Sequence, residues 1–120
     1  MWKKHLGKDG ERAAREYLES LGMKILAQNW RYGRCELDII AQQVDVLHVV
    51  EVKTRWDDRY VDVRQLVRKS QQERLLTAAQ AYVEQNRSTA AIQIDLLVVI
   101  LHPAGGMHFE YIPDAICDNF

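Results

Sequence analysis

The segment from Leu47 to Lys53 (LHVVEVK) constrains the fold of this chain most, because it is apolar and β-branched yet carries two charged side chains. Such a run is typical of a buried β-strand. Successive side chains of a strand alternate between its two faces, so Glu51 and Lys53 are expected side by side on one face. Buried charges are costly unless they have partners or bind an ion. The segment therefore predicts a core strand whose charges meet a compensating partner or a bound cation.

The size and composition are those of one globular α/β domain covering residues 1–120, with 48% hydrophobic and 28% charged residues. No apolar run approaches the roughly 18 residues of a membrane span, and the first residues lack the apolar stretch of a signal peptide. These features predict a cytoplasmic protein with no membrane partner.

The two cysteines, Cys35 and Cys117, do not form a zinc-type cluster, and we expect free thiols that fill small apolar spaces.

The charges are distributed unevenly along the chain. The net charge of −1 is unfavourable for a nucleic-acid-binding protein, but all 16 lysine and arginine residues lie within residues 1–87. A local basic surface of this kind is able to hold a phosphate backbone. A solvated face of mixed charge explains the same distribution equally well. The basic residues that surround the charged strand in sequence are Arg31, Arg34, Lys53, Arg55, Arg59, Arg64, Arg68, Lys69 and Arg74.

Apolar periodicity and turn residues predict the order α-β-β-β-α-β, followed by a small β ending. Asp9 is a suitable N-cap for the first helix, with Glu11 in its first turn, and Gly22 is a suitable stop. This order is typical of an α/β sandwich in which helices flank a mixed sheet. The remaining expected elements are strands at 23–30, 36–41 and 46–54, a loop at 56–62, a helix at about 66–85, a strand at 92–101, a turn at 103–106, a strand at 107–112 and a helical turn at 113–116.

The second and third strands are expected to form an antiparallel hairpin with a two-residue loop at Val44 and Asp45. In that register the numbers of paired residues have a constant sum, and Asp38 lies opposite Glu51. Valine is a poor residue for the tight turns that close such hairpins. A longer loop with an even number of residues would keep the same register, whereas an odd number would break it.

The Cβ atoms of opposed residues such as Asp38 and Glu51 lie roughly 4.5–5.5 Å apart. Two carboxylates at that distance repel each other unless a cation lies between them. Mg²⁺ retains several waters, so one or two protein carboxylates suffice to bind it. Lys53, one side chain along, is suited to align the attacking water and neutralise a phosphate. The residues alone fit equally well with a ladder of ion pairs, Glu36 with Lys53 and Asp38 with an arginine.

Other polar and aromatic residues have simpler explanations. Glu11 is a further candidate ligand if its helix packs across the sheet, but a carboxylate near a helix N-terminus more often complements the helix dipole. Asp95 is expected to pair with an arginine or to cap a turn. The four histidines are expected to be surface or strand residues, since a metal cluster needs convergent ligands. Core or edge packing is the simpler expectation for four aromatic residues, and stacking on unpaired bases is the alternative. These residues are Trp30, Tyr32, Trp56 and Tyr60.

The two segments Gly33–Ala41 (GRCELDIIA) and Val49–Arg55 (VVEVKTR) resemble the bacterial YraN family. The Glu-Val-Lys-Thr-Arg sequence is the most specific part, and the resemblance covers nearly the whole chain. The further segments that carry it are Gly10–Ala14, Tyr17-Leu18, Gly22, Asn29, Arg31, Arg74–Leu76, Ala78-Ala79, Tyr82, Asp95–Ile100 and Tyr111–Ile116.

The YraN family in turn is similar to the PD-(D/E)XK nuclease superfamily, close to the archaeal-type Holliday junction resolvases. This resemblance implies a restriction-endonuclease-like core and metal-dependent hydrolysis of DNA phosphodiesters, with branched or junction DNA as the substrate. It implies that Asp38 and Glu51 bind Mg²⁺ or Mn²⁺, that Lys53 is the catalytic lysine, and that Glu11 is an additional acidic site residue. Symmetric junction cutting would call for a homodimer.

Two alternatives to a nuclease stay open. One is a non-catalytic nucleic-acid-binding module on the same fold, and the other is a protein-interaction domain whose charged strand residues pair internally. The first is favoured by the near-neutral charge and by Gln93, which stands where the family usually has arginine. Cys35 stands where the family usually has glycine, and a close backbone approach there would be altered.

Five residues are expected to contact nucleic acid. Arg55 is the best phosphate-binding candidate, because it lies just past the charged strand, and Thr54 is placed to assist it. Gln71 stands in the second helix where the family usually has lysine. Lys69 or Arg68 is expected to substitute for that lysine.

Overall fold

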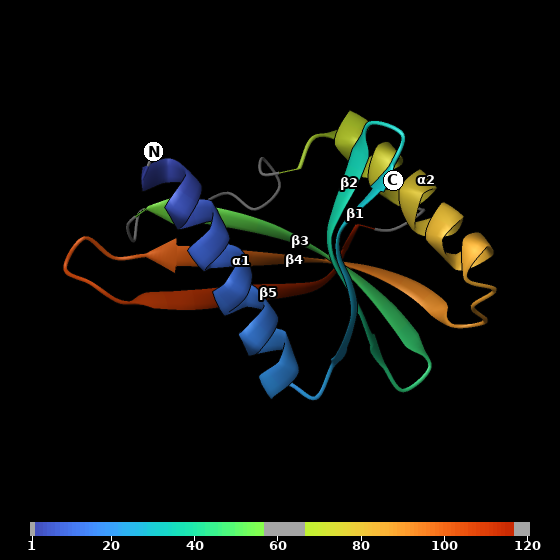
Figure 1. Ribbon diagram of the computed structural model, residues 1–120, viewed down its shortest axis with the longest axis horizontal. Helices are drawn as coiled ribbons and strands as arrows, with labels where there is room; N and C mark the ends of the chain where they lie inside the picture. Colours follow the sequence, from blue (N-terminus) through green and yellow to red (C-terminus); the bar gives the residue numbers. More distant parts are fainter. Residues whose placement is uncertain (1, 57–66, 117–120) are drawn as a thin grey trace.

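The computed structural model describes residues 2–56 and 67–116, which form two helices and five strands (Figure 1). The predicted order α-β-β-β-α-β is confirmed, and a fifth strand follows it. Cys117 and the predicted loop beyond Trp56, with Arg59, Tyr60 and Arg64, lie outside the described residues. In chain order the elements are α1 (Trp2–Ser20), β1 (Lys24–Tyr32), β2 (Cys35–Gln43), β3 (Val46–Trp56), α2 (Lys69–Gln85), β4 (Ala91–Leu101) and β5 (Met107–Ile116).

The five strands form one open sheet in the order β1-β2-β3-β4-β5. Neighbouring strands are antiparallel except β3 and β4, which are parallel, so the predicted mixed sheet is confirmed. A parallel pair needs a crossover connection, and α2 lies within the connection from β3 to β4. In projection the strands converge near the middle and fan out at both ends, as expected for a twisted sheet (Figure 1).

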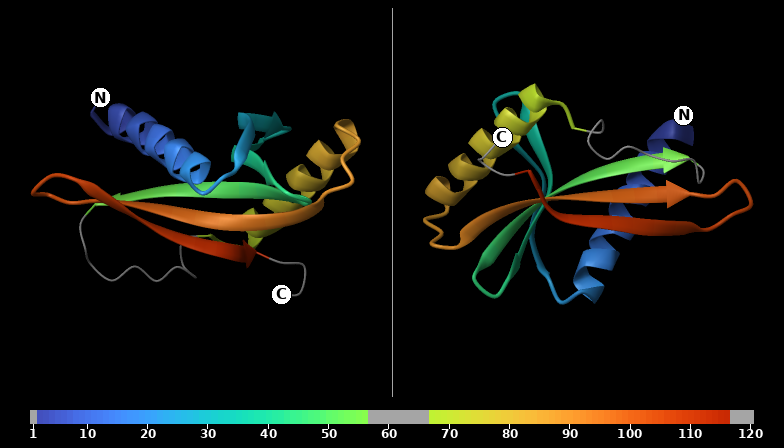
Figure 2. Two further views of the ribbon diagram at one scale, coloured as in Figure 1. Left: turned by 90° about the horizontal axis from the view of Figure 1, so that it is seen from below. Right: turned by 180° about the vertical axis from the view of Figure 1, so that it is seen from behind.

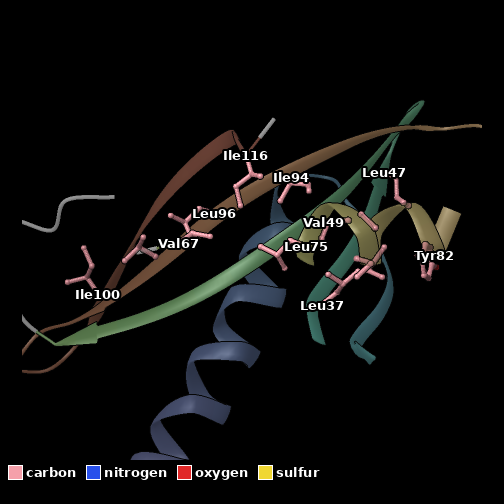
Figure 3. Packing of buried hydrophobic residues seen from close by; sticks show 14 residues of the cluster. Leu37, Leu47, Val49, Val67, Leu75, Tyr82, Ile94, Leu96, Ile100 and Ile116 are labelled. Carbon is pink, nitrogen blue, oxygen red and sulfur yellow. The ribbon is translucent and has the colours of Figure 1, made fainter. Parts of the chain in front are cut away.

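The two helices cover opposite faces of the sheet, so the sheet has an apolar core on each side (Figure 2). In β3, Val49 packs in the cluster that contains α2 residues, whereas the adjacent Val50 packs in the cluster that contains α1 residues. Strand β4 is buried on both faces, which explains its unbroken apolar run at residues 96–100. The cluster on the α2 side includes Leu37, Leu47, Val49, Leu75, Tyr82, Ile94, Leu96 and Ile116 (Figure 3).

Helix α1 begins at Trp2, so the predicted start at Asp9 is wrong. The intervening residues do not stop a helix, because lysine and leucine are good helix formers and an interior glycine such as Gly7 destabilises a helix by only about 1 kcal/mol. Glu11 therefore lies in the middle of α1 rather than in its first turn. The helix dipole does not explain Glu11, because that effect falls off within the first turn.

Helix α1 approaches the sheet closely at Gly10, which faces Thr54 of β3. A Cβ atom at residue 10 would lie only 2.5 Å from Thr54 Oγ1. One and two turns further along α1, Ala14 and Leu18 are fully buried against the same face of the sheet. The absence of a side chain at Gly10 thus lets α1 cross β3 next to its charged segment.

The hairpin of β2 and β3 has the predicted register and the predicted two-residue loop. Ile39 pairs with Val50, and the pairing continues in the same register to the loop. Val44, in the loop, has a φ of 54° and is 83% exposed. A β-branched residue is rare in this left-handed region, so the loop is locally strained.

The predicted helical turn at residues 113–116 is wrong, because β5 continues as a strand through them. The pairing of β5 is irregular between Ile94 and Leu96 of β4. Asp114, at this irregularity, has a φ of 53°, and its N–H group donates to Asp95 Oδ1 at 2.8 Å. A contact with a distant side chain therefore replaces the local hydrogen bond that a helical turn would have made.

Asp95 is fully buried and has partners from three strands. It pairs with His48 Nδ1 at 2.7 Å, and it accepts hydrogen bonds from Gln93 Nε2 at 2.9 Å and from the Tyr111 hydroxyl. None of these partners, all within residues 2–56 and 67–116, is an arginine, and together they satisfy the carboxylate. Burial, together with the Asp95 carboxylate, raises the pKa of Tyr111 above its usual value, so its hydroxyl remains a donor.

Candidate functional site

The candidate site lies where β2 and β3 separate (Figure 1). The backbone pairing of the two strands runs from the loop to Ile39 and Val50, and Asp38 and Glu51 are the next residues on each strand. At this point the N–H group of Val52 donates to Asp38 Oδ2 at 2.8 Å. The side chain of Asp38 thus takes the place of a backbone acceptor, and the two carboxylates lie at the end of the ladder.

Glu51 is the most deeply buried charged group of this site, with 6% of its surface exposed. Its Oε1 lies 3.7 Å from Lys53 Nζ and 3.4 Å from Gln71 Nε2 of α2. Its Oε2 is also buried, and it has no hydrogen-bond partner within residues 2–56 and 67–116. A buried carboxylate oxygen without a donor is costly, which makes it suited to bind a cation.

The electrostatics of the site oppose two ionised carboxylates. Burial, with the added effect of the Asp38 carboxylate, raises the pKa of Glu51 to about 8, although Lys53 acts in the opposite direction. Burial also raises the pKa of Asp38, against the stabilising hydrogen bond from Val52, and the charge of Glu11 adds to the rise. A divalent cation between the carboxylates would relieve both effects, and their oxygen atoms are ligands that Mg²⁺ and Mn²⁺ prefer.

Glu11 reaches the site from α1. It lines a cavity of about 240 Å³ together with Asp38, and the same cavity contains Arg12, Arg15 and Asn29. The structure therefore brings Asp38, Glu51 and Lys53 together, with Glu11 on the α1 side of Asp38. Sequence reasoning missed the two arginines, although Arg15 follows Glu11 by four residues and so lies on the same helix face.

No group of three or more histidine, cysteine, aspartate or glutamate side chains within the described part of the chain is arranged to hold a metal ion. A cation at this site would rest on Asp38 and Glu51, with water and substrate oxygens as its other ligands. Such a ligand set is common for Mg²⁺, which keeps several waters when it binds to proteins.

The Glu36–Lys53 pair of the alternative ladder is wrong, whereas the pairing of Asp38 with an arginine stays a prediction. Glu36 pairs with Arg31 of β1 at 2.9 Å, and Lys53 pairs with Glu51 on its own strand. The reason is that β2 leaves β3 after Ile39 but stays paired with β1, so the neighbours of Glu36 come from β1.

The five predicted nucleic-acid contacts lie on different sides of the site. Arg68 and Lys69 are exposed at the start of α2, where Gln71 contacts the carboxylate of Glu51. Arg55 is also exposed, and its Nη1 donates to the carbonyl of Thr54 at 2.9 Å. Thr54 itself faces Gly10 of α1, on the face of β3 opposite Glu51.

No helix within residues 2–56 and 67–116 is long and apolar enough to cross a membrane.

Comparison with known proteins identifies the family of the chain. The model of the family described as "Uncharacterised protein family UPF0102" matches residues 10–99. This range includes the three acidic residues and the lysine of the candidate site. A UPF0102 protein of Christiangramia forsetii is 36% identical over 110 residues, covering 92% of this chain and 92% of the relative. A UPF0102 protein of Mycolicibacterium vanbaalenii is 39% identical over 95 residues, covering 78% of each chain. The chain therefore belongs to the UPF0102 family, as its resemblance to the YraN family predicted.

Proposed function

We propose that this protein is a metal-dependent endonuclease that hydrolyses DNA phosphodiesters on a core of the restriction-endonuclease type. The observation that carries the proposal is the half-buried Asp38 beside the buried Glu51 and Lys53, with Oε2 of Glu51 lacking a hydrogen-bond partner among the described residues. Two acids and an amine at the point where two core strands part also form the pattern that the resemblance to PD-(D/E)XK nucleases implies.

Asp38 and Glu51 would hold Mg²⁺ or Mn²⁺, and Glu11 adds negative charge on the other side of Asp38. When bound, the ion supplies Lewis-acid polarisation of the phosphate and activation of water. The donor set fits such an ion because it consists of hard oxygen atoms whose mutual repulsion Lys53 offsets only in part.

The neighbouring residues of the chain have separate roles in this proposal. Lys53 is partly buried and lies 3.7 Å from Glu51, so its amino group offers positive charge to the phosphate and a hydrogen-bond donor to the attacking water. The Gln71 amide donates to Oε1 of Glu51, which fixes the orientation of that carboxylate. The exposed Arg68, Lys69 and Arg55 would hold the DNA backbone near the site.

The substrate and assembly rest on resemblance alone. Branched or junction DNA is the expected substrate, and a homodimer would supply two cuts in a symmetric junction. The test is a cleavage panel of linear, flapped, single-stranded and four-way DNA with Mg²⁺, with Mn²⁺ and with EDTA. We expect cleavage in the presence of either ion and none in EDTA.

Matched variants make this test specific. Glu51→Gln should abolish cleavage, and Lys53→Met should reduce it by roughly 100-fold or more. Glu36→Gln is the control, because Glu36 lies on β2 close to Asp38 but pairs with Arg31 outside the site. The proposal fails if Glu51→Gln and Lys53→Met cut as well as the parent protein while circular dichroism shows all of them folded.

A second candidate is a non-catalytic nucleic-acid-binding module. It is favoured by Gln71, a neutral residue that occupies Oε1 of Glu51, and by the net charge of −1. Calorimetry with Mn²⁺ separates the two functions, because a non-catalytic scaffold does not need a cation between Asp38 and Glu51. Heat of binding that Glu51→Gln removes would support the nuclease.

A further inference from the structure

A second cleft lies between the β1–β2 turn and the beginning of α2. Its volume is about 520 Å³, within the range of small-molecule binding sites. Tyr32, Arg34 and Cys35 line it on the side of the sheet, and Ser70, Glu73 and Arg74 line it on the side of the helix. None of these residues lines the cavity that contains Glu11 and Asp38.

The cleft presents an aromatic ring with a fixed orientation. The ring of Tyr32 is nearly parallel to that of Trp30, with an angle of 5° between their planes and 6.3 Å between their centroids. Trp30 in turn packs edge-on against the buried Tyr82 of α2, at 5.2 Å. Tyr32 nevertheless remains 43% exposed. The aromatic pair is therefore anchored at Trp30 and open at Tyr32.

The walls of the cleft carry two arginines that come from different elements. Arg34 lies in the turn between β1 and β2, and Arg74 lies in α2, with Glu73 beside it. Guanidinium groups bind phosphate with two parallel hydrogen bonds and also stack on planar groups. An exposed aromatic residue beside arginines is one arrangement by which proteins bind single-stranded nucleic acid. In a duplex the faces of the bases are stacked on each other, so a tyrosine ring can reach only an unpaired base.

The cleft adjoins the candidate active site. The thiol of Cys35 lies in its wall, and the pKa of this thiol is raised by burial and by the charge of Glu51, with a smaller contribution from Asp38. Arg74 acts on the same thiol in the opposite direction. On α2, Gln71 contacts Glu51 and is the neighbour of Ser70 in the cleft. The cleft and the candidate site therefore draw on the same two elements, β2 and α2, at nearby positions.

We propose that this cleft binds an unpaired nucleotide next to the scissile phosphate, with its base on Tyr32 and its phosphate on Arg34 and Arg74. The substrate is then DNA that contains a single-stranded segment, so among branched substrates flapped DNA is favoured over a fully paired four-way junction. This inference rests on the proposed nuclease function for the reaction, but the binding that it describes needs neither cleavage nor a metal ion.

The test measures binding by fluorescence anisotropy, with the intact chain and with EDTA in the buffer. The probes are a labelled single-stranded oligonucleotide, the blunt duplex of the same sequence, and that duplex with a short unpaired arm. We expect the single strand and the armed duplex to bind about tenfold more tightly than the blunt duplex. Tyr32→Ala should weaken binding of the single strand about tenfold or more, the effect of one lost stacked base, whereas Tyr32→Phe should not.

Arginine variants test the same cleft independently of the ring. Arg34→Gln and Arg74→Gln should each lower the dependence of log affinity on log salt by roughly 0.7, as expected for one lost phosphate contact on a single strand. Blunt duplex that binds as tightly as the single strand, or Tyr32→Ala binding equal to that of the parent, would overturn the inference. Because these measurements exclude metal, they can fail while the cleavage panel succeeds, and the reverse holds as well.

Discussion

The stability of the metal-free protein should depend on pH through Glu51. This side chain is 6% exposed, and burial, with the Asp38 carboxylate, raises its pKa from the usual 4.5 to about 8. Between these two values the folded protein keeps a proton on Glu51, whereas the unfolded chain releases it. The unfolded state thus binds fewer protons in this interval, so the free energy of unfolding falls as the pH rises.

The magnitude follows from the size of the pKa shift. Each pH unit within the interval corresponds to about 1.4 kcal/mol. Between pH 5 and pH 8 the contribution of Glu51 to the free energy of unfolding should therefore fall by about 3 to 4 kcal/mol. The contribution is fully present below the unfolded pKa of 4.5 and is lost as the pH rises through about 8. Glu51→Gln cannot ionise, and its amide oxygen can still accept from Gln71, so this dependence should disappear in the variant.

Urea unfolding in EDTA, followed by circular dichroism at several pH values between 5 and 8, measures the effect. The difference between the parent and Glu51→Gln removes the contributions of titrating groups that do not contact Glu51. Asp38 is the exception, because its pKa depends in part on its contact with Glu51. We expect the variant to be the more stable protein at pH 8. The difference in the free energy of unfolding between the two proteins should shrink by about 3 to 4 kcal/mol toward pH 5. Glu36→Gln should follow the parent, because its carboxylate pairs with Arg31 outside the site. Parallel profiles for the parent and Glu51→Gln would refute the reasoning.

Two further substitutions test the backbone that positions the site. Val44→Asn should raise the free energy of unfolding by about 1 kcal/mol, because asparagine tolerates the φ of 54° better than valine does. Urea unfolding measures the effect, with Val44→Ala as the control. An asparagine variant that is no more stable than the alanine variant would contradict this prediction. Gly10→Ala should lower the free energy of unfolding by about 1 to 3 kcal/mol despite the better helix propensity of alanine, since the new Cβ would meet Thr54 Oγ1 at 2.5 Å. Thr54→Ala in the same chain should recover most of that loss, and equal destabilisation by Gly10→Ala with and without it would argue against the contact.

The parts of the fold that depend on local sequence could be predicted. Alternation of apolar residues placed Glu51 and Lys53 on one face of β3, and the even loop set the register that brings Asp38 beside Glu51. That register held even though Val44 is unfavourable in the turn. The reason is that a shift by one residue would turn the apolar side chains of β2 and β3 from the core to solvent.

The parts that depend on distant contacts could not be predicted. The continuation of β5 past Ile112 depends on Asp95, whose carboxylate binds the N–H group of Asp114. The start of α1 at Trp2 could not be predicted, because residues 2–8 contain no serine, threonine, aspartate or asparagine to cap the helix and no strong helix breaker. The cleft at Tyr32 needs the crossover of α2 to bring Arg74 beside it, a juxtaposition that no spacing in the sequence reveals.

The separation of β2 from β3 links the stability of the protein to the chemistry proposed for it. On the side of the separation toward the hairpin loop, Ile39 and Val50 are buried and paired, which holds the two strands in one register. On the other side, Asp38 uses its carboxylate as a substitute for a backbone acceptor, and the strands open so that side chains from both helices reach the gap. The resulting buried carboxylates destabilise the metal-free fold, a common property of functional sites. A bound cation would reverse that effect. Binding of an ion between Asp38 and Glu51 would therefore raise the free energy of unfolding.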